Sequence, residues 1–370
     1  MSKKQFLQFL ICLGVAITGS IGCSSEESSK EQSESFLDAK EQNDTEDSEK
    51  KSETSQPTNT TIVPDSELPK FFAPLTGLAL DNEGAAKKTI TAVKIDNSDS
   101  LTKVLGIGKA DIVYEYLGAE KATNFLALFQ SQNVENVGPV GEAQLSDIHI
   151  LMNQPAVMLV TAKTKLALRE VLKASGIHDV KAESFTSSDI PANNDSGREK
   201  IYVSLNEITD PDAENRPNSL APWRFKDRPD VTSAKKNELE EVSIDWGETQ
   251  TVFKWIPAEK HWARYEEGTL SLDAEGTPIA IQNIVVQFVR YTLSDESDRQ
   301  GERIPEFEGD AGIGEAWIFN GSSRLEAVWS KDNLTAPTVF SDEQGNIVQF
   351  GQGSSWVLFA KSGSATILEK

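Results

Sequence analysis

Two carboxylates stand where the chain could build a polar site. Asp96 and Asn97 follow the β-branched segment 89–95, and Glu115 lies inside the alternating segment 111–117. Side chains at strand ends often bind ligands in α/β domains, and carboxylates can act as general acid and base. Two simpler interpretations stay open: Asp96 and Asn97 could start a turn, and Glu115 could be an exposed residue at a strand end.

The surroundings of Glu115 determine its chemistry. Strand alternation puts Glu115 on the apolar face of its strand, opposite the face that carries Tyr114. A carboxylate on an apolar face needs a partner or water, and its pKa rises if it is buried without a cation. Later in the chain, Arg264 and Asp273 flank a hairpin-like segment. The simpler interpretation of these two residues is a cross-strand pair.

Other catalytic and metal sites lack their sequence signatures. None of the three His stands at a metal-ligand spacing such as H-E-x-x-H, and there is no G-x-S-x-G nucleophile elbow. Gly106–Lys109 and Gly312–Gly314 each precede a strand, so they are turns and not phosphate loops. Asp295–Asp298 lacks EF-hand spacing and is interpreted as a solvated acidic loop. We therefore expect no metal and no cofactor.

Composition narrows the classes of function. The 370 residues include 58 Asp and Glu against 36 Lys and Arg, a formal net charge of −22. Nucleic-acid binding needs clustered Lys and Arg, so nucleic acid is excluded as a partner, as is a basic patch on an anionic bilayer. Six of the seven Trp lie between residues 246 and 356. They predict an aromatic core there, with an exposed row that stacks cell-wall sugars as the alternative.

The N-terminus has the form of an export signal. Residues 1–22 combine two early lysines with an apolar run that ends in small residues, which is typical of a secretory signal peptide. Residues 20–23, Ser-Ile-Gly-Cys, resemble a bacterial lipobox, in which the Cys is acylated and the signal is cut just before it. This resemblance implies a membrane anchor of acyl chains, such as palmitate, on Cys23. Cleavage would also remove Cys12, so no intramolecular disulfide is expected.

The rest of the chain divides by composition. Residues 23–70 are rich in Glu, Asp and Ser and poor in large hydrophobic residues. Such a segment cannot bury enough apolar surface to fold, so we expect a lipid-anchored, disordered acidic tether. We expect an N-terminal domain over 71–215, a Pro-rich inter-domain segment over 216–236 and a C-terminal domain over 237–370.

Periodicity predicts an α+β fold. Helices are expected over 146–152 and 164–174, the second capped by Thr164 and ended by Gly176. The N-terminal domain is then of α/β type, with a mixed sheet and flanking helices, and the C-terminal domain is mainly β, a small sandwich or barrel. The expected strands are 89–95, 111–117, 123–130, 156–161, 251–256, 261–265, 279–280, 284–291, 316–320, 325–329, 346–350 and 356–360.

Several short segments recur in an order that resembles one family. In the first half they are Pro74–Leu78, Val93–Asn97, Ala110–Glu115, Phe125–Ser131 and Gly138–Val140, and in the second half Tyr265–Asp273, Gln282–Gln287, Asn320–Trp329 and Gly353–Trp356. Their order and spacing resemble the YerB-like lipoproteins of Gram-positive bacteria. The resemblance implies a lipid-anchored protein with two successive domains, both of unknown function.

The chain departs from this family at basic positions. The resemblance leads us to expect basic residues at Gly141, Gln144 and Asn124, and a Pro-His-Asn stretch at 199–202. A cluster of Arg with a nearby His would suit a carboxylate or phosphate ligand. Any polar ligand of a typical member is therefore expected to bind this chain weakly or differently.

These observations favour a non-catalytic binding or interaction module, anchored through Cys23 at the extracytoplasmic face of the cell membrane, with a cell-wall component, small ligand or protein as partner. The alternative is a cell-envelope hydrolase that uses Asp96 and Glu115 as acid and base, and a structural spacer is a third possibility. Two carboxylates converging in one cleft, within about 5–10 Å as in glycosidases, would favour the enzyme. The candidate ligand-binding residues are Asp96, Asn97, Tyr114, Glu115, Asn124, Arg264 and Asp273.

Overall fold

The computed structural model describes most of the chain beyond residue 70. The described ranges are 71–98, 104–118, 122–186, 200–215, 217–218, 220–226, 238–273, 276–298, 301–309 and 311–370. The predicted signal peptide, Cys23, the tether and much of the inter-domain segment lie outside them. Within these ranges, no helix has the length and apolar character needed to cross a bilayer.

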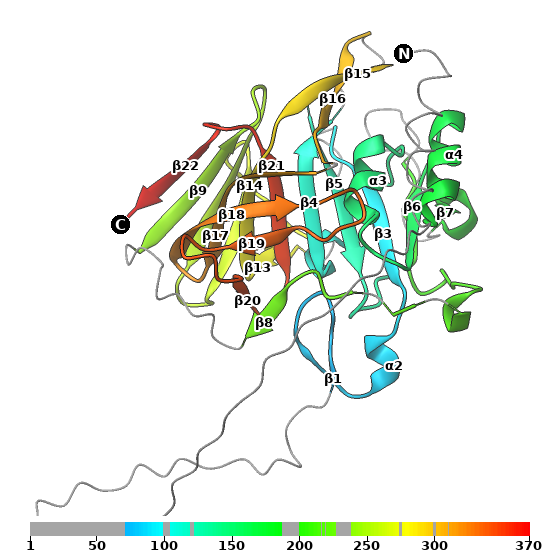
Figure 1. Cartoon of the computed structure of the whole chain (residues 1–370), viewed down its shortest axis with the longest axis horizontal. Helices are drawn as coiled ribbons and strands as arrows, with labels where there is room; N and C mark the ends of the chain where they lie inside the picture. Colours follow the sequence, from blue (N-terminus) through cyan, green and yellow to red (C-terminus); the bar gives the residue numbers. More distant parts are fainter. Residues whose placement is uncertain are drawn as a thin grey trace, which may run out of the picture. The chain divides into compact units, whose positions relative to one another are not determined.

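A ten-stranded mixed sheet is the main element of the fold (Figure 1). Its edge-to-edge order is β19 (Val339–Ser341), β18 (Ser323–Lys331), β17 (Gly312–Asn320), β14 (Asn283–Phe288), β21 (Ser355–Ala360), β4 (Ile112–Leu117), β5 (Thr123–Phe129), β3 (Ile90–Asp96), β6 (Val157–Thr161) and β7 (His178–Lys181). Every residue of β5 and β21 is buried. Strands that are buried on both faces are expected to contain continuous apolar sequences. Both strands do so after their first polar residues.

Strand β21 joins the two halves of the chain. It runs parallel to β14 on one side and parallel to β4 on the other, with Trp356 opposite Ile284 and Val113. The strands of both halves therefore form one hydrogen-bonded sheet. The division into domains over 71–215 and 237–370 remains a prediction.

A second sheet covers one face of the first. It contains β12 (Thr269–Leu270), β11 (His261–Glu266), β10 (Gln250–Ile256), β9 (Leu239–Asp245) and β22 (Ala365–Glu369), with β13 (Ala280–Ile281) also paired to β11. The core between the two sheets is largely aromatic. The Trp356 ring lies 5.6 Å from the Phe125 ring and 6.1 Å from the Phe253 ring, and both contacts are edge-to-face, a favourable geometry for aromatic pairs.

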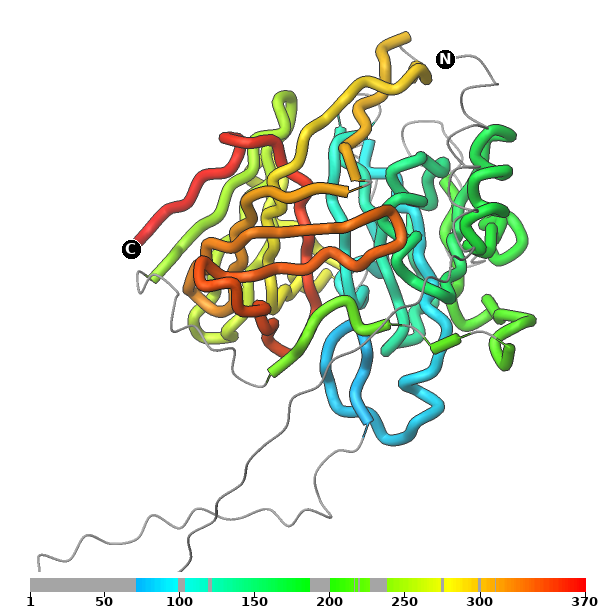
Figure 2. Tube along the Cα trace, viewed as in Figure 1, coloured from blue at the N-terminus to red at the C-terminus, as the bar shows by residue number. Residues whose placement is uncertain are grey.

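Helices and short strands cover the other face of the ten-stranded sheet. Figure 1 shows α4 (Leu166–Ser175) beside β6 and β7. The other helix, α3 (Leu145–Leu151), contacts β16 (Arg303–Phe307). Strand β16 forms a hairpin with β15 (Tyr291–Ser297), and Figure 2 shows the course of this hairpin. A second apolar core fills this side. The remaining elements are β1 (Phe71–Phe72), β2 (Ala79–Leu80), α2 (Glu83–Ala86), β8 (Arg224–Lys226), β20 (Gln349–Gly351) and the 3-10 turns Ile107–Lys109, Ala182–Phe185 and Ala213–Asn215.

The fold class is closer to all-β than to the expected α+β. The N-terminal half contributes five strands to the mixed sheet, whereas α3 and α4 are short and cover only part of one face. The C-terminal strands do pack as two layers, but one layer continues into the N-terminal half, so they do not form a self-contained sandwich. Each expected strand is found with shifted ends. Ten strands were not predicted: β1, β2, β7, β8, β9, β12, β15, β16, β19 and β22.

Local signals gave mixed results. Gly176 ends α4 in the left-handed region, with φ 76°, as expected. Thr164 is not the cap of α4: the N-cap residue is Lys165, and the Thr164 hydroxyl donates to Asp179 at 3.1 Å. Four of the six C-terminal Trp are buried and the other two, Trp255 and Trp317, pack partly buried against the core, which confirms the core interpretation for them.

Two glycines test how much the fold depends on left-handed backbone. Gly106 (φ 75°) and Gly176 (φ 76°) share this conformation, but a Cβ on Gly106 would lie 2.4 Å from the Asn136 carbonyl oxygen, while one on Gly176 meets nothing within 4 Å. Gly176→Ala should lower the free energy of unfolding by about 1–2 kcal/mol, and Gly106→Ala should lower it further because of the clash. Urea denaturation measures both, and equal losses would contradict the clash.

Candidate functional site

Glu115 is enclosed between the two sheets. It lies in β4 with its side chain on the face that packs against the six-stranded sheet, and it is 0% exposed. The interpretation of Glu115 as an exposed strand-end residue is therefore wrong. Strand alternation, which put Glu115 on the apolar face with Val113 and Leu117, is confirmed by the core that these neighbours join.

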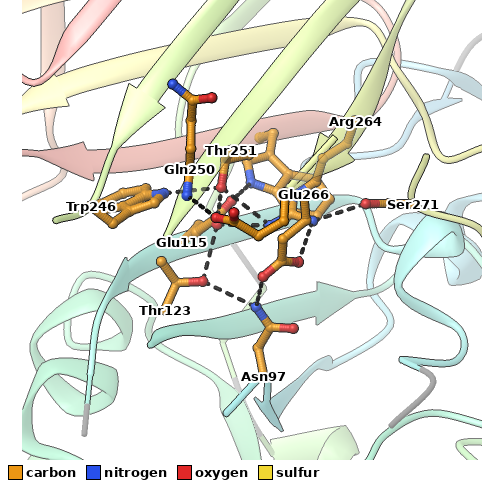
Figure 3. Close-up of polar contacts among 11 residues, drawn as sticks. Asn97, Glu115, Thr123, Trp246, Gln250, Thr251, Arg264, Glu266 and Ser271 are labelled. Atoms are coloured by element: carbon orange, nitrogen blue, oxygen red, sulfur yellow. Dashed lines mark hydrogen bonds and ion pairs between the residues drawn. The ribbon is translucent and has the colours of Figure 1, made fainter. Parts of the chain in front are cut away.

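Both oxygens of the Glu115 carboxylate accept hydrogen bonds (Figure 3). Arg264 Nη2 donates to Oε1 at 2.9 Å, and the hydroxyls of Thr123 and Thr251 donate to the same oxygen at 3.1 and 3.0 Å. The indole Nε1 of Trp356 donates to Oε2 at 2.7 Å. Four donors from strands β5, β10, β11 and β21 thus surround one carboxylate from β4.

Arg264 is the cation of this cluster. Its Nη1 donates to Glu266 Oε2 at 2.9 Å and to the Ser271 hydroxyl at 3.0 Å. The guanidinium also lies 5.3 Å from the centre of the Trp356 ring, within the range of a cation–π contact. Burial alone would lower the pKa of Arg264, but the carboxylates of Glu115 and Glu266 raise it above its usual value, so Arg264 stays charged.

The cluster reaches the surface at one edge. Asn97 Nδ2, at the end of β3, donates to the Thr123 hydroxyl at 3.1 Å and to Glu266 Oε1 at 3.0 Å. Glu266 is the more open end, since its side chain is 31% exposed. At the opposite end, Trp246 Nε1 donates to the Thr251 hydroxyl at 3.0 Å. We call this set the inter-sheet cluster: Asn97, Glu115, Thr123, Trp246, Thr251, Arg264, Glu266, Ser271 and Trp356.

The inter-sheet cluster contains only three of the seven candidate residues, Asn97, Glu115 and Arg264. Asp96 binds Lys200 Nζ at 3.5 Å and accepts from the Ser98 backbone N–H at 2.9 Å, so the turn interpretation of Asp96 has direct support.

The other three candidates lie apart from the cluster's hydrogen bonds. Asn124 is opposite Asp96 in the β3–β5 register. Tyr114 points to the other face of the sheet, where its ring stacks on Phe359 with centroids 5.8 Å apart. Asp273 accepts a hydrogen bond from the Gly106 backbone N–H at 2.7 Å, and the expected Arg264–Asp273 pair is replaced by the ion pairs of Arg264 with Glu115 and Glu266.

Sequence reasoning missed most partners in the inter-sheet cluster. Glu115 and Arg264 are 149 positions apart, and Glu115 and Trp356 are 241 apart. No local spacing connects them. The one usable signal was the need of a buried carboxylate for a cation.

A second buried cluster lies on the opposite face of the sheet. Lys94 Nζ contacts the Tyr116 hydroxyl at 2.7 Å and Asp147 Oδ1 at 3.3 Å, and the Tyr116 hydroxyl also bonds to Asp147. The other oxygen of Asp147 accepts from the Gln144 backbone N–H at 2.7 Å, at the start of α3. Burial and the Asp147 carboxylate raise the pKa of Tyr116 well above its usual value. This cluster attaches α3 to the sheet.

Three described lysines near the positions where basic residues were expected are each paired with a carboxylate. Lys94 is committed to Asp147, and a Cβ on Gly141 would already lie 3.3 Å from its Cγ. Lys163 pairs with Glu142 at 3.6 Å and Lys165 with Glu296 at 2.5 Å. The described ranges also hold no group of His, Cys, Asp and Glu suited to a metal ion.

One ligand-sized hollow lies away from both clusters. We call it the α2 cleft; it measures about 600 Å³, within the usual range of small-molecule sites. Its floor is apolar, formed by Phe129, Met158, Leu205 and Ile208. Three of its charged groups have partners: Lys87 pairs with Glu83, Lys88 bonds to Asn133, and Asp210 accepts from Thr89.

The Glu115–Arg264 pair can be tested by a double-mutant cycle. Arg264→Met leaves a buried carboxylate without its cation and should lower the free energy of unfolding by about 3–5 kcal/mol. Glu115→Leu combined with Arg264→Met removes both charges and should recover part of that loss. Urea denaturation of the single and double variants measures the coupling.

A matched control uses an exposed pair of the same type. Arg290 and Glu308 lie 2.8 Å apart, with the Arg290 side chain 87% exposed, so Arg290→Met should change the free energy of unfolding by no more than about 1 kcal/mol. Equal effects at Arg264 and Arg290 would show that burial adds nothing to the pair.

The pair of Asp96 and Lys200 should make stability depend on acid pH. Burial alone would raise the pKa of Asp96, but hydrogen bonds from Ser98 and the Lys200 charge hold it below its ordinary value of 3.8. A depressed carboxyl pKa stabilises the fold above the ordinary pKa, and this contribution is lost as pH falls through the folded-state pKa. Lys200→Met should therefore destabilise the protein at about pH 6 more than at about pH 2.

The control for this comparison is Lys163→Met, which removes the same charge from an exposed pair. It should give a small difference from the wild type that hardly varies with pH. A Lys200→Met deficit that stays constant across the acid range would remove the linkage to Asp96. Chemical denaturation at each pH supplies both curves.

Comparison with known proteins places the chain in a family. Residues 75–218 match the N-terminal domain and residues 242–357 the C-terminal domain of a protein of unknown function, DUF3048. Over 321 residues the chain is 25% identical to YerB of Bacillus subtilis (strain 168), a candidate lipoprotein, covering 83% of this chain and 91% of that protein. The crystal structure of YerB protein from Bacillus subtilis shares the fold, with a TM-score of 0.67 at 22% identity, covering 81% of this chain and 100% of that one. The chain belongs to the YerB-like family, as a divergent member that carries both DUF3048 domains.

Proposed function

We propose that this protein is a lipoprotein anchored through Cys23 at the extracytoplasmic face of the cell membrane, and that its folded part is a non-catalytic binding module. The observation that carries the non-catalytic role is the state of Glu115. This carboxylate is 0% exposed and is occupied by Arg264 and three further donors. A group closed in this way holds two sheets together and cannot exchange protons with a substrate.

A hydrolase has less support from this geometry. Acid–base hydrolysis of a glycoside needs two carboxylates that flank the bond to be cut. Asp96 and Glu115 instead bind separate cations, Lys200 and Arg264, on different elements. The two carboxylates that line the α2 cleft, Asp210 and Glu214, come from one short segment of chain and so do not face each other from separate elements.

A pure spacer has less support as well, because a spacer needs no hollow of ligand size. The α2 cleft combines an apolar floor with polar groups at its edge, which is the usual composition of a small-molecule site. The lipid anchor is supported by the Ser-Ile-Gly-Cys sequence at 20–23 and by the similarity to a candidate lipoprotein. Acyl chains on one residue would supply the membrane affinity.

Intact-mass spectrometry of the membrane fraction tests the anchor. The wild type should give a mature chain that begins at Cys23 and carries a diacylglyceryl group. Cys23→Ala should lose this mass and leave the membrane fraction, because the thiol that receives the lipid is gone.

The other cysteine provides a matched control. Cys12 lies within the segment expected to be removed, so Cys12→Ala should leave the mature mass unchanged. A soluble, unlipidated wild-type product would refute the anchor. Turnover of cell-wall material by the purified protein would refute the non-catalytic role separately.

A further inference from the structure

A small hollow lies on the face of the ten-stranded sheet that is opposite the inter-sheet cluster. It measures about 40 Å³ and is bordered by α3, by the end of β16, by β18 and β19, and by Trp223. We call it the aromatic slot, after the rings of Tyr114, Trp223, Phe307, Trp329 and Phe359 that line it. A buried water occupies about 10–15 Å³ on this measure, so the slot has room for about three waters or one small functional group.

One amide in the aromatic slot has no hydrogen-bonding partner among the described residues. Gln287 is 6% exposed and lines the slot, and no described residue bonds to its side-chain amide. This amide is not one of the fully buried polar atoms that lack a partner, so it faces the open space of the slot. A molecule that enters the slot can bond to it in place of water.

A second unpartnered group lies close by in the register of the sheet. Tyr114 pairs with Val357 in β4–β21, and Gln287 pairs with Phe359 in β14–β21, so both side chains emerge on the same face across β21. No other described residue forms a hydrogen bond with the Tyr114 hydroxyl. Burial raises the pKa of this hydroxyl, so it keeps its proton and can both donate and accept.

The apolar walls are rings that stack on one another. Phe307 stacks on Phe359 with centroids 4.4 Å apart, and Phe359 stacks in turn on Tyr114. At the border, Trp223 is held on Phe350 with centroids 4.5 Å apart and stays partly exposed. A partly exposed indole that is packed on another ring offers a flat surface to the ring of a ligand.

The charged groups at the aromatic slot are already engaged. Glu308 pairs with Arg290 at 2.8 Å. The Lys331 ammonium donates to the backbone carbonyls of His149 and Gly309 at 3.3 and 3.0 Å. The slot therefore favours an uncharged ligand over an anion or a cation.

We propose that the aromatic slot binds the acetamido group of an N-acetylated amino sugar. The methyl lies against Phe307 and Phe359, the amide bonds to Gln287 and Tyr114, and the sugar ring packs on Trp223. An acetamido group suits the slot because it is small and uncharged, with an apolar end and one donor and one acceptor to match the two unpartnered side chains. This inference rests on the binding role proposed above and names its ligand class.

Saturation-transfer NMR on the full-length protein in detergent tests the ligand. N-acetylglucosamine should bind with the strongest transfer to its acetyl methyl, and glucosamine and glucose should bind at least about tenfold more weakly, since a lost hydrogen-bonding partner in a buried site costs at least this factor. Equal binding of all three sugars, or of none, would overturn the proposal. N-methylacetamide binding as tightly as the sugar would overturn the role of the sugar ring.

Two variants locate the binding in the slot. Gln287→Leu should abolish binding of N-acetylglucosamine without lowering the melting temperature, because no described residue bonds to the amide that it removes. Tyr114→Phe should weaken binding about tenfold, while Tyr265→Phe, on β11 of the other sheet, should leave it unchanged. Undiminished binding by Gln287→Leu, or a large fall in its melting temperature, would contradict the assignment.

The outcome can be separated from that of the proposed function. If N-acetylglucosamine does not bind, the slot holds only water and this inference fails. The mass of the Cys23 anchor and the absence of turnover are measured independently, so the binding role would then have to be sought at the α2 cleft.

Discussion

The ion pair of Glu115 and Arg264 is the interaction on which the arrangement of the two sheets depends. Each charge is almost completely removed from water, at 0% and 2% exposure. Moving such ions into a protein interior is costly, and their attraction offsets that cost only when the remaining hydrogen bonds are also satisfied. Thr123, Thr251 and Trp356 complete the shell of the carboxylate. The sheets must therefore meet in one register, since a slip in the position of Arg264 would leave Glu115 buried without a cation.

The same pair connects the two halves of the chain. Glu115 comes from the first half, Arg264 from the second, and Trp356 from near the C-terminus, in the strand that lies beside β4. Long-range contacts of this kind form only after large loops have closed. The two family models match successive parts of the sequence. In the structure, the strands of both parts form one continuous sheet and share one core.

Sequence reasoning could predict the strands better than their partners. The β-branched runs that became β3, β4, β5 and β6 carry their own signal, because alternation and bounding turn residues are local. Strand β9, with Glu240 and Glu241 among its first residues, and the acidic hairpin of β15 and β16 had no such signal, since their polar residues match those of a solvated loop. The need of Glu115 for a cation followed from alternation and burial, but Arg264 could not be chosen because strand pairing across 149 positions is a property of the tertiary fold.

The fold shows what surrounds Gly141, one of the positions where the family resemblance leads us to expect a basic residue. Gly141 packs against Lys94 and Asp96, and the nearby cations Lys94 and Lys200 are buried and bound to carboxylates. An anion arriving there would have to compete with Asp147 and Asp96 for them. On the other side of β4 from Glu115, Gln287 and Tyr114 have no hydrogen-bonding partner among the described residues and line the aromatic slot. One strand thus serves both faces of the sheet. Strand β4 directs Glu115 to a shell of four donors between the two sheets, and it directs Tyr114, its neighbour in sequence, to the aromatic slot, where the hydroxyl can bond to a ligand.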